Sequence, residues 1–468
     1  MIGKDEGRDS MAMGDQEGAA QSEFWIETQS LAKAPGHPFY QRLNEVLRRD
    51  SFDEHVNGLC EKFYKEGGRP SVPPPVYFRM LMIGYFEGLD SERGIAWRCA
   101  DSMSLRDFLG YTLKERTPDH SSLSRIRQRI DLQTHQEIFQ WVLKQLAQSD
   151  LLRGKTVGVD ATTLEANAAL RSIVRRDTGE KYDEFLTRLA KESGIETPTR
   201  EDLAKLDRER KHKASNDDWK HPHDPDARIA KMKDGSTHLA HKAEHGVDFD
   251  SGAVLSVTLQ HADLGDTETI YETVLEATEN LQKLAQGAHM PEHVAERVEE
   301  VVGDKGYHSN DTMTGCAEAE IRTYISEPKR RGARDWDGKA EKQRAVYANR
   351  RRIKGARGKR LLRKRGELVE RSFAHCYETG GMRRTWLQGH AKILKRLLIH
   401  VAAFNLSLIL RKLVGHGTPR ELADRLKDLV LSLFAAMRGR EAWYAEDLRN
   451  LTAALFGRIE TSPSVAAA

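Results

Sequence analysis

The sequence predicts a mixed α/β fold, in which a sheet is flanked by helices and preceded by an all-α N-terminal domain. Two apolar runs, at 155–164 and 300–304, each deliver one aspartate where the run ends, as expected of buried strands. Between residues 151 and 415 the order of elements is strand, insertion, strand, strand, helix, strand, helix, strand. An order of this kind produces a mixed sheet with helices on its faces.

Length and composition limit the classes of protein that fit. A chain of 468 residues supports two or three domains, and an apolar fraction of 39% is sufficient for real cores. The net charge of +3 excludes a general polycation, although 31% of the residues are charged. The four cysteines are far apart and have no paired spacing, which argues against a disulfide framework or a cysteine zinc site. A reducing cytoplasm is therefore expected.

No secretory signal or membrane span is expected. The first residues are acidic and lack the apolar core of a signal sequence. The strongest apolar run, at 397–410, is interrupted by polar residues and is shorter than the roughly 18 residues that a span needs. We predict a buried core helix there.

The N-terminal part divides into a polar leader at 1–30, expected to be poorly ordered, and a helical domain at 31–150. N-cap residues at 119–122 open a helix in which arginines alternate with apolar residues. We predict that this helix binds DNA as part of a helix-turn-helix-like pair. The alternative is an ordinary solvated basic face. The arginines are Arg125, Arg127 and Arg129.

A polar segment at about 174–236 contains many turn formers, among them prolines at 222 and 225, and we interpret it as an insertion rather than as core. Two strands separated by a turn then predict a hairpin. The elements predicted after the insertion are strands at 237–248 and 253–263, a helix from about Asp266, and strands at 300–304 and 321–326.

Two aspartates lie where predicted strands end. Asp304 follows the run at 300–303, and Asp160 lies in the run at 155–164. The carboxyl edge of a sheet is where open α/β folds place their ligands. Two buried strands that each present one carboxylate suggest a shared divalent cation. The alternative for Asp304 is that it caps a turn.

A basic segment at 329–365 contains a dense run of Lys and Arg with few opposing acids. A one-sided run of this kind repels itself unless a polyanion neutralises it, which points to nucleic acid. An amphipathic helix follows, with Glu367 and Glu370 one turn apart. Glu370 adjoins the apolar face of this helix, and an acid at a core edge needs a partner such as a metal ion.

Three carboxylates on rigid elements are what metal-dependent phosphoryl transfer requires. Mg²⁺ prefers oxygen ligands and keeps positions open for phosphate and water. Two ions about 4 Å apart stabilise both the attacking and the leaving oxygen. We therefore expect Mg²⁺ or Mn²⁺, with two ions bound.

Four motifs in this part of the chain resemble those of bacterial insertion-sequence transposases of the DDE type, which have an RNase H-like catalytic core. The motifs are VGVDATTLEANAAL, HLAHKAEHGVD, VVGDKGYHS and RGELVERSFAHCYETGG. The stretch from HPFYQRLNEVL to PDHSSLSRIRQRI resembles their helical InsH-type N-terminal domain. The resemblance extends from about His37 to Arg420. It implies an RNase H-like catalytic domain at 151–415. Beyond that domain, the sequence itself predicts a helical tail at 416–468, with helices at 421–437 and 441–456.

The resemblance implies that Asp160, Asp304 and Glu370 are the catalytic residues and the metal ligands, with Glu367 a weaker candidate than Glu370. Related enzymes carry a Tyr-Arg-Glu-Lys pattern around the glutamate, whereas this chain has Gly366 four residues before Glu370 and Tyr377 seven after it.

The implied reaction is hydrolysis at a transposon end, followed by attack of the freed 3′-hydroxyl on target DNA. The implied partner is double-stranded DNA, both transposon ends and target, and the implied assembly is a homodimer in the cytoplasm. His308 is an accessory candidate that would orient a nucleophile. The residues expected to contact DNA are Arg125, Arg127, Arg129, Lys305, Arg350, Arg351, Arg352 and Arg371.

Three other functions remain open from the sequence. A zinc hydrolase is suggested by a histidine-rich region, although strand alternation would place His238 on the face opposite to His241 and His245. A DNA-binding repressor with an inactive site and an RNase H-like nuclease that cuts without joining are the others. The remaining histidines of that region are His221 and His223.

Overall fold

The computed structural model describes residues 36–65, 71–112, 114–210, 214–232, 235–287, 291–329 and 334–428, together with 430–432 and 434. The chain divides into two units, 1–36 and 37–468, and the second contains the elements described below. The predicted leader at 1–30 and the predicted helix at 441–456 lie outside the described residues.

The N-terminal part of the second unit is helical, as predicted. Pro74 begins α3, where its fixed φ suits a first helical turn. Asp119 caps α6 by accepting the Ser122 N–H at 2.8 Å, and Asp131 caps α7 in the same way through Thr134. The helices are α1 Pro38–Arg49, α2 Phe52–Cys60, α3 Pro74–Phe86, α4 Glu92–Asp101, α5 Met103–Phe108, α6 His120–Arg129 and α7 Leu132–Gln148.

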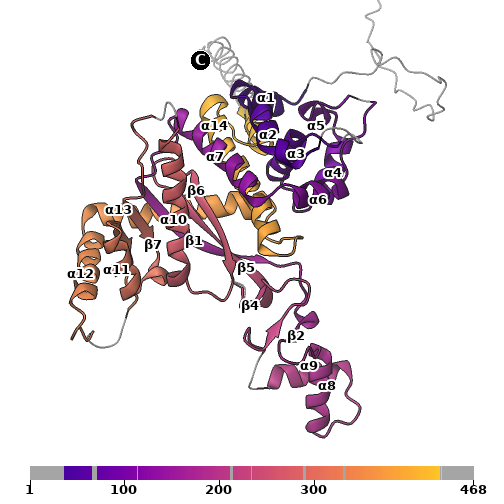
Figure 1. The fold of residues 1–468 in the computed structure, drawn as a ribbon, viewed down its shortest axis with the longest axis vertical. Coiled ribbons are helices and arrows are strands. Elements are labelled where there is room, and N and C mark those ends of the chain that lie inside the picture. The colour runs from indigo at the N-terminus through magenta and orange to yellow at the C-terminus, as the bar shows by residue number, and fades with distance from the viewer. Residues whose placement is uncertain are drawn as a thin grey trace, which may run out of the picture. The chain divides into compact units, whose positions relative to one another are not determined.

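A mixed six-stranded sheet follows, in the order β4-β5-β1-β7-β8, with β6 also paired to β5 (Figure 1). β1, β7 and β8 are parallel, whereas β4, β6 and β1 are each antiparallel to β5. The predicted mixed sheet is thereby confirmed. Its strands are β1 Thr156–Glu165, β4 Arg228–Lys231, β5 Thr237–Asp248, β6 Val254–His261, β7 Glu300–Gly303 and β8 Arg322–Ile325.

The predicted hairpin between β5 and β6 is confirmed. Ser251 donates its hydroxyl to Asp248 at 2.8 Å, and Gly252 has a φ of +80°, which a residue with a Cβ rarely adopts. Because side chains alternate along a strand, this turn sets which residues of β5 face each helical layer.

Helices cover both faces of the sheet. A Cβ at Gly246 of β5 would lie 3.6 Å from Thr273 of α10 (Asp266–Ala285), and a Cβ at Gly158 of β1 would lie 3.0 Å from Val369 of α13 (Ala356–Phe373). Figure 1 shows α10 lying along the strands. Asp160, two residues after Gly158, is therefore on the face that α13 covers.

Two more helices, α11 (Asn310–Glu318) and α12 (Ala340–Lys354), pack together beside β8. Asn349 of α12 donates to Ile325 O at 2.8 Å and accepts the Ile325 N–H at 3.1 Å. These bonds satisfy the backbone of an edge strand, which would otherwise present unpaired groups.

The insertion has a small core of its own, which its polar composition did not indicate. It contains β2 (Val174–Arg175), α8 (Tyr182–Glu192), α9 (Arg200–Glu209) and β3 (Trp219–Lys220). Apolar side chains gather between these elements and the start of β5, separately from the main core. The buried members of this cluster are Ala166, Ile173, Tyr182, Leu186, Trp219, Ala227 and Leu239.

The predicted core helix is confirmed as part of α14 (His390–Val414), which is buried over most of its length. Lys395 donates to the carbonyls of Arg127 and Ile130 at 3.0 and 2.7 Å, and Arg396 donates to Leu81 O at 2.8 Å. These bonds satisfy carbonyls of the N-terminal helical region, so α14 joins that region to the sheet.

One helical stretch in the described part of the chain, His390–Ser432, is long and apolar enough to cross a membrane by length and composition alone. Of its most apolar window, 83% is buried inside the protein, as is usual for a core helix. The predicted tail helix at 421–437 is helical as far as it is described.

Candidate active site

Asp160 and Asp304 come from adjacent parallel strands in matching register. Gly158 of β1 is paired with Val302 of β7, so each aspartate follows its paired residue by two positions. Asp304 directly follows β7, as predicted, whereas Asp160 lies within β1 and not at its end, because β1 continues to Glu165 alongside β5. Neighbouring strands lie about 4.8 Å apart. Burial raises the pKa of Asp160 above its usual range, and the nearby Asp304 carboxylate adds to this increase, which Arg365 opposes. The two carboxylates therefore interact electrostatically.

Arg365 of α13 is the direct partner of Asp160. Its Nη1 lies 2.7 Å from Asp160 Oδ2, and the Ala161 N–H donates to Oδ1 at 2.9 Å. Both side chains are largely shielded, with exposures of 17% for Arg365 and 25% for Asp160. This ion pair attaches α13 to β1. This ion pair was not predicted from the sequence, because Arg365 is one of many basic residues in its segment.

Asp304 also caps a turn. Its Oδ1 accepts the Gly306 N–H at 2.7 Å at the start of a 3₁₀ turn, Lys305–Tyr307. The capping alternative for Asp304 is therefore observed. It does not exclude metal binding, since a carboxylate has two oxygens and several acceptor positions.

A buried network holds this turn against β5. Tyr307 donates its hydroxyl to Glu244 at 2.7 Å, and Thr269 and Thr273 of α10 donate to the same carboxylate. Lys242, on the same face of β5 as Glu244, donates to Asp266 at 2.7 Å. These residues were not predicted from the sequence, although charged side chains that alternate along a buried strand indicate that each has a partner.

Substitution of Gly306 by Ala is expected to reduce metal-dependent DNA cleavage by about 100-fold, because misplacing a reacting group by about 1 Å has that effect. A Cβ at Gly306 would overlap Asp266 Oδ2 and lie 3.0 Å from Asp304 Oδ1, so the aspartates must shift. The stability cost should stay below about 1 kcal/mol, because the ends of side chains can move. Cleavage kinetics and urea unfolding of the variant measure both effects. Full cleavage activity would contradict the expectation.

Glu370 lies on the part of α13 that contacts β1. Its neighbour Val369 packs over Gly158, while Glu370 itself is exposed. Glu367 is also exposed and pairs with Arg371 at 2.9 Å. A π-helical turn, Ala374–Thr379, follows α13, and such turns are frequent at functional sites.

The two departures from the family pattern have distinct surroundings. Tyr377 is buried, and its hydroxyl lies 2.7 Å from Nε2 of His245. Gly366 lies beside the Glu370 carboxylate: a Cβ added at Gly366 would be 3.9 Å from Oε1 of Glu370. The basic group near the aspartates comes instead from Arg365, one residue earlier.

The basic residues predicted to contact DNA fall into two groups. Arg350 donates to Glu327 at 2.6 and 2.8 Å, and Arg352 donates to Thr323 O at 2.9 Å, so both hold α12 in place. Lys305 and Arg351 are exposed and form no ion pair among the described residues. Exposed cations on α13, which we call the α13 basic face, are equally unpaired within the described ranges: Lys359, Arg360 and Arg363.

His308 is buried, with an exposure of 6%. The hydrogen bond from Arg350 lowers the pKa of Glu327, and the charges of Arg334 and His308 add to this effect. His308 is therefore close to the ion pairs that hold α12, and its burial favours a structural role over contact with a nucleophile.

The three arginines of α6 differ in exposure. Arg125 and Arg129 are exposed, and Arg129 lies over the ring of Tyr64 at 5.0 Å. Arg127 is 5% exposed and forms an ion pair with Glu92, which corrects its expected role as a DNA contact. Alternation with apolar residues did not reveal this, because one arginine can face the core when an acid from another helix pairs with it.

Substitution of Arg127 by Ala is expected to lower the free energy of unfolding by about 3 kcal/mol, since it leaves a largely buried Glu92 without its partner. Arg125→Ala should change stability by less than about 0.5 kcal/mol. Chemical denaturation of both variants tests the difference. Equal stability of the two would mean that the pair with Glu92 has no structural role.

The histidines that suggested the alternative of a zinc hydrolase do not form one site. His241 is buried and lies 3.2 Å from Asp224, whereas His245 lies 3.0 Å from Ser372 and 2.7 Å from Tyr377. His238 is 44% exposed on the opposite face of β5. That alternative was wrong in its choice of ligands, because each buried histidine has its own partner.

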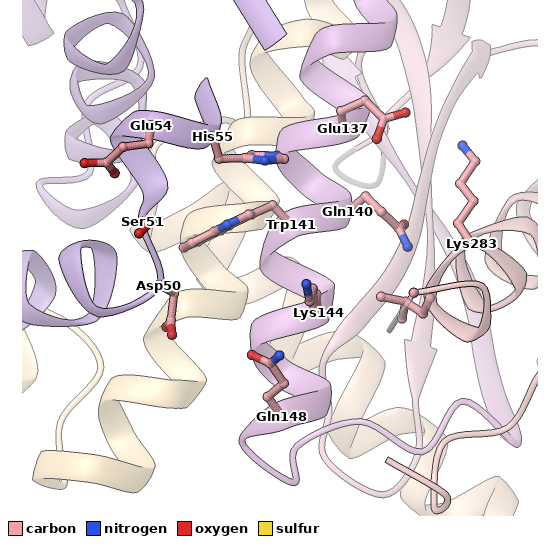
Figure 2. A pocket seen from close by; sticks show the side chains of 12 residues that line it. Asp50, Ser51, Glu54, His55, Glu137, Gln140, Trp141, Lys144, Gln148 and Lys283 are labelled. Atoms are coloured by element: carbon pink, nitrogen blue, oxygen red, sulfur yellow. The ribbon is translucent and has the colours of Figure 1, made fainter. Parts of the chain in front are cut away.

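A cavity of about 380 Å³ lies between α2, α7 and the end of α10 (Figure 2). His55 and Trp141 stack at 6.4 Å on one side, and Lys283 contributes from α10. Lys283 is 17 residues from Asp266, or about 26 Å along a helix. The cavity and the carboxylates are therefore at opposite ends of α10.

Comparison with known families matches two parts of the chain. Residues 28–129 match a family model described as a transposase domain (DUF772), and residues 315–410 match one described as a transposase DDE domain. The second match includes Glu370 and Arg365. A comparison with the curated proteins gives no match.

Proposed function

We propose that the chain is an insertion-sequence transposase of the DDE type, which cleaves DNA at insertion-sequence ends and joins those ends to target DNA. Two parts of the chain match family models of transposase domains, and its catalytic half has an RNase H-like fold. The observation that carries the proposal is the pair of aspartates on adjacent parallel strands, beneath a helix that bears Glu370.

Asp160, Asp304 and Glu370 are the proposed catalytic residues and metal ligands. The donor set fits a hard divalent cation, because it consists of carboxylate oxygens. Two Mg²⁺ or Mn²⁺ ions bound there would supply an activated water and stabilise the charge on the leaving oxygen. Glu367, which pairs with Arg371, is the weaker candidate for the third position and serves as an internal control.

Arg365 and the turn at 304–308 position the reacting groups. Arg365 holds Asp160 in a fixed orientation, and a cation that used Oδ2 would share that oxygen with the guanidinium. Tyr307, fixed by Glu244, prevents the turn that carries Asp304 from moving away from β1. Lys305 at the exposed end of the turn and the α13 basic face would contact DNA phosphates.

The N-terminal helices, 31–150, are the proposed DNA-binding domain, with Arg125 and Arg129 as phosphate contacts. Double-stranded DNA is the partner of transposase domains, and we infer a homodimer because two transposon ends must be held together. We infer a cytoplasmic location, as expected of the bacterial insertion-sequence transposases that the chain resembles.

A strand-transfer assay with pre-cut ends separates this function from that of a nuclease that only cuts. Purified full-length protein, end DNA with a free 3′-hydroxyl, a target plasmid and Mg²⁺ should give joined products. Target cleavage without joining would favour the nuclease. Joining that persists in EDTA would contradict metal-dependent catalysis.

A further inference from the structure

A second group of metal-type ligands lies away from the carboxylate site. Asp226, His261 and His390 each place one donor atom within 4.8 Å of the other two. Asp226 belongs to the loop before β4, His261 ends β6, and His390 begins α14. Three segments that are far apart in the sequence therefore meet at this point.

The hydrogen bonds of His261 fix which of its nitrogens can bind a metal. Its Nδ1 lies 2.9 Å from the backbone carbonyl of Asp226, and a carbonyl can only accept, so Nδ1 carries the proton. The lone pair is then on Nε2. A histidine that donates its other N–H to a carbonyl is the usual arrangement of a metal ligand. Arg228 Nη2 lies 3.5 Å from this Nε2 and is the group that a metal ion would displace.

His390 supplies the second imidazole. Its Nε2 is buried and has no hydrogen-bond partner among the described residues. A buried polar atom without a partner is costly, and an ion would satisfy it. The ring lies between those of His241 and His261, at 5.0 and 4.8 Å between centroids. Its backbone N–H donates to Asp226 Oδ2 at 3.1 Å, which holds the carboxylate beside the ring.

Neighbouring bonds hold the loop of Asp226 against α14. Asp224 accepts the Gly389 N–H at 3.0 Å and lies 3.2 Å from His241. The loop is therefore attached at two carboxylates to the first turn of the helix. A tetrahedral ion with bonds near 2.0 Å would hold its ligand atoms roughly 3.4 Å apart. The three donor atoms would therefore each have to move by about 1 Å or less to bind the ion.

We propose that Asp226, His261 and His390 form a binding site for Zn²⁺ or a similar borderline divalent cation, with water as the fourth ligand. Two imidazoles favour such an ion over Mg²⁺, which prefers oxygen. The bound ion clamps the loop at the end of the insertion to the sheet and to the start of α14. This site is independent of the proposed catalytic carboxylates.

The test is a titration of the full-length protein, purified with a tag that contains no histidines and stripped with EDTA. Co²⁺ is added in the presence of excess Mg²⁺, which occupies carboxylate sites. The expected result is one Co²⁺ per chain with the intense visible absorption of four-coordinate cobalt, lost on addition of one equivalent of Zn²⁺. No such band, or no zinc bound in excess Mg²⁺, would overturn the proposal.

Variants locate the site. His261→Ala and His390→Ala should each weaken Zn²⁺ binding by at least about 100-fold, and Asp226→Asn by at least about 10-fold while retaining the acceptor for His390 N–H. His223→Ala, an exposed histidine of the same segment, should bind as the wild type does. Wild-type affinity in both histidine variants would refute the assignment.

Folding of the variants is monitored by thermal unfolding with and without Zn²⁺. The wild type should be stabilised by Zn²⁺ through mass action, and the histidine variants should not. Should His261→Ala fail to fold, His261→Gln replaces it. Asp304→Asn should leave Zn²⁺ binding unchanged, so that failure of the catalytic proposal is distinguishable from failure of this one.

Discussion

Asp160→Asn, Asp304→Asn and Glu370→Gln are each expected to reduce strand cleavage by at least about 1,000-fold while DNA binding persists. Each change removes a carboxylate charge that would hold a cation worth several kcal/mol of transition-state stabilisation, and about 1.4 kcal/mol corresponds to a factor of ten. The measurement is cleavage of end DNA in Mg²⁺ together with binding of the same DNA by gel shift.

Matched controls separate catalysis from folding. Glu367→Gln removes an exposed acid of the same helix, and Asp250→Asn removes one in the β5–β6 turn. Both should cleave at close to the wild-type rate. Asp160→Asn also leaves Arg365 without its partner, so its unfolding must be measured alongside. If Glu370→Gln cleaves substantially and Glu367→Gln does not, Glu367 and not Glu370 is the third catalytic carboxylate.

Replacing Lys359, Arg360 and Arg363 together by Ala is expected to weaken DNA binding and to flatten its dependence on salt. Each phosphate contact contributes about 0.9 to the slope of log K against log salt, so three lost contacts reduce the slope by about 2.7. These side chains are exposed and unpaired in the described part of the chain, so stability should change little. Fluorescence anisotropy over a range of salt concentrations measures the slope.

The control for this variant carries the same change of net charge elsewhere: Lys181, Lys191 and Arg200 replaced by Ala, all exposed on the insertion. A specific interface requires that the salt slope fall only for the α13 variant. If both triple variants lose the same slope, binding depends on the total charge of the protein and not on the α13 basic face.

Local patterns identified the secondary structure well. The strand predicted at 237–248 has those same bounds, and the predicted helix begins at Asp266 as expected. The bounds of the strands predicted at 253–263 and 321–326 differ from the observed bounds by at most two residues at either end. Alternation and turn residues act over a few positions, so they are visible in the sequence. The small core of the insertion was missed because its members come from several short segments.

The side-chain contacts of the candidate active site could not be predicted from the sequence. Asp160 and Arg365 are 205 residues apart, and no local pattern marks their ion pair. Arg127 and Arg125 have similar sequence neighbours, yet one is buried against Glu92 and the other is exposed. Whether a charged residue faces a core depends on a partner from another element, which periodicity does not encode.

The sequence alone determined the mixed sheet, its helical N-terminal domain and the position of Asp304 at the end of β7, because hydrophobic spacing and turn chemistry act between near neighbours. It did not reveal that Asp160 lies within β1. Only the tertiary structure decided that Arg365 pairs with Asp160, that Tyr307 is fixed by Glu244, and that His261 and His390 meet Asp226. Each of these contacts joins distant segments, so it exists only once the chain has packed.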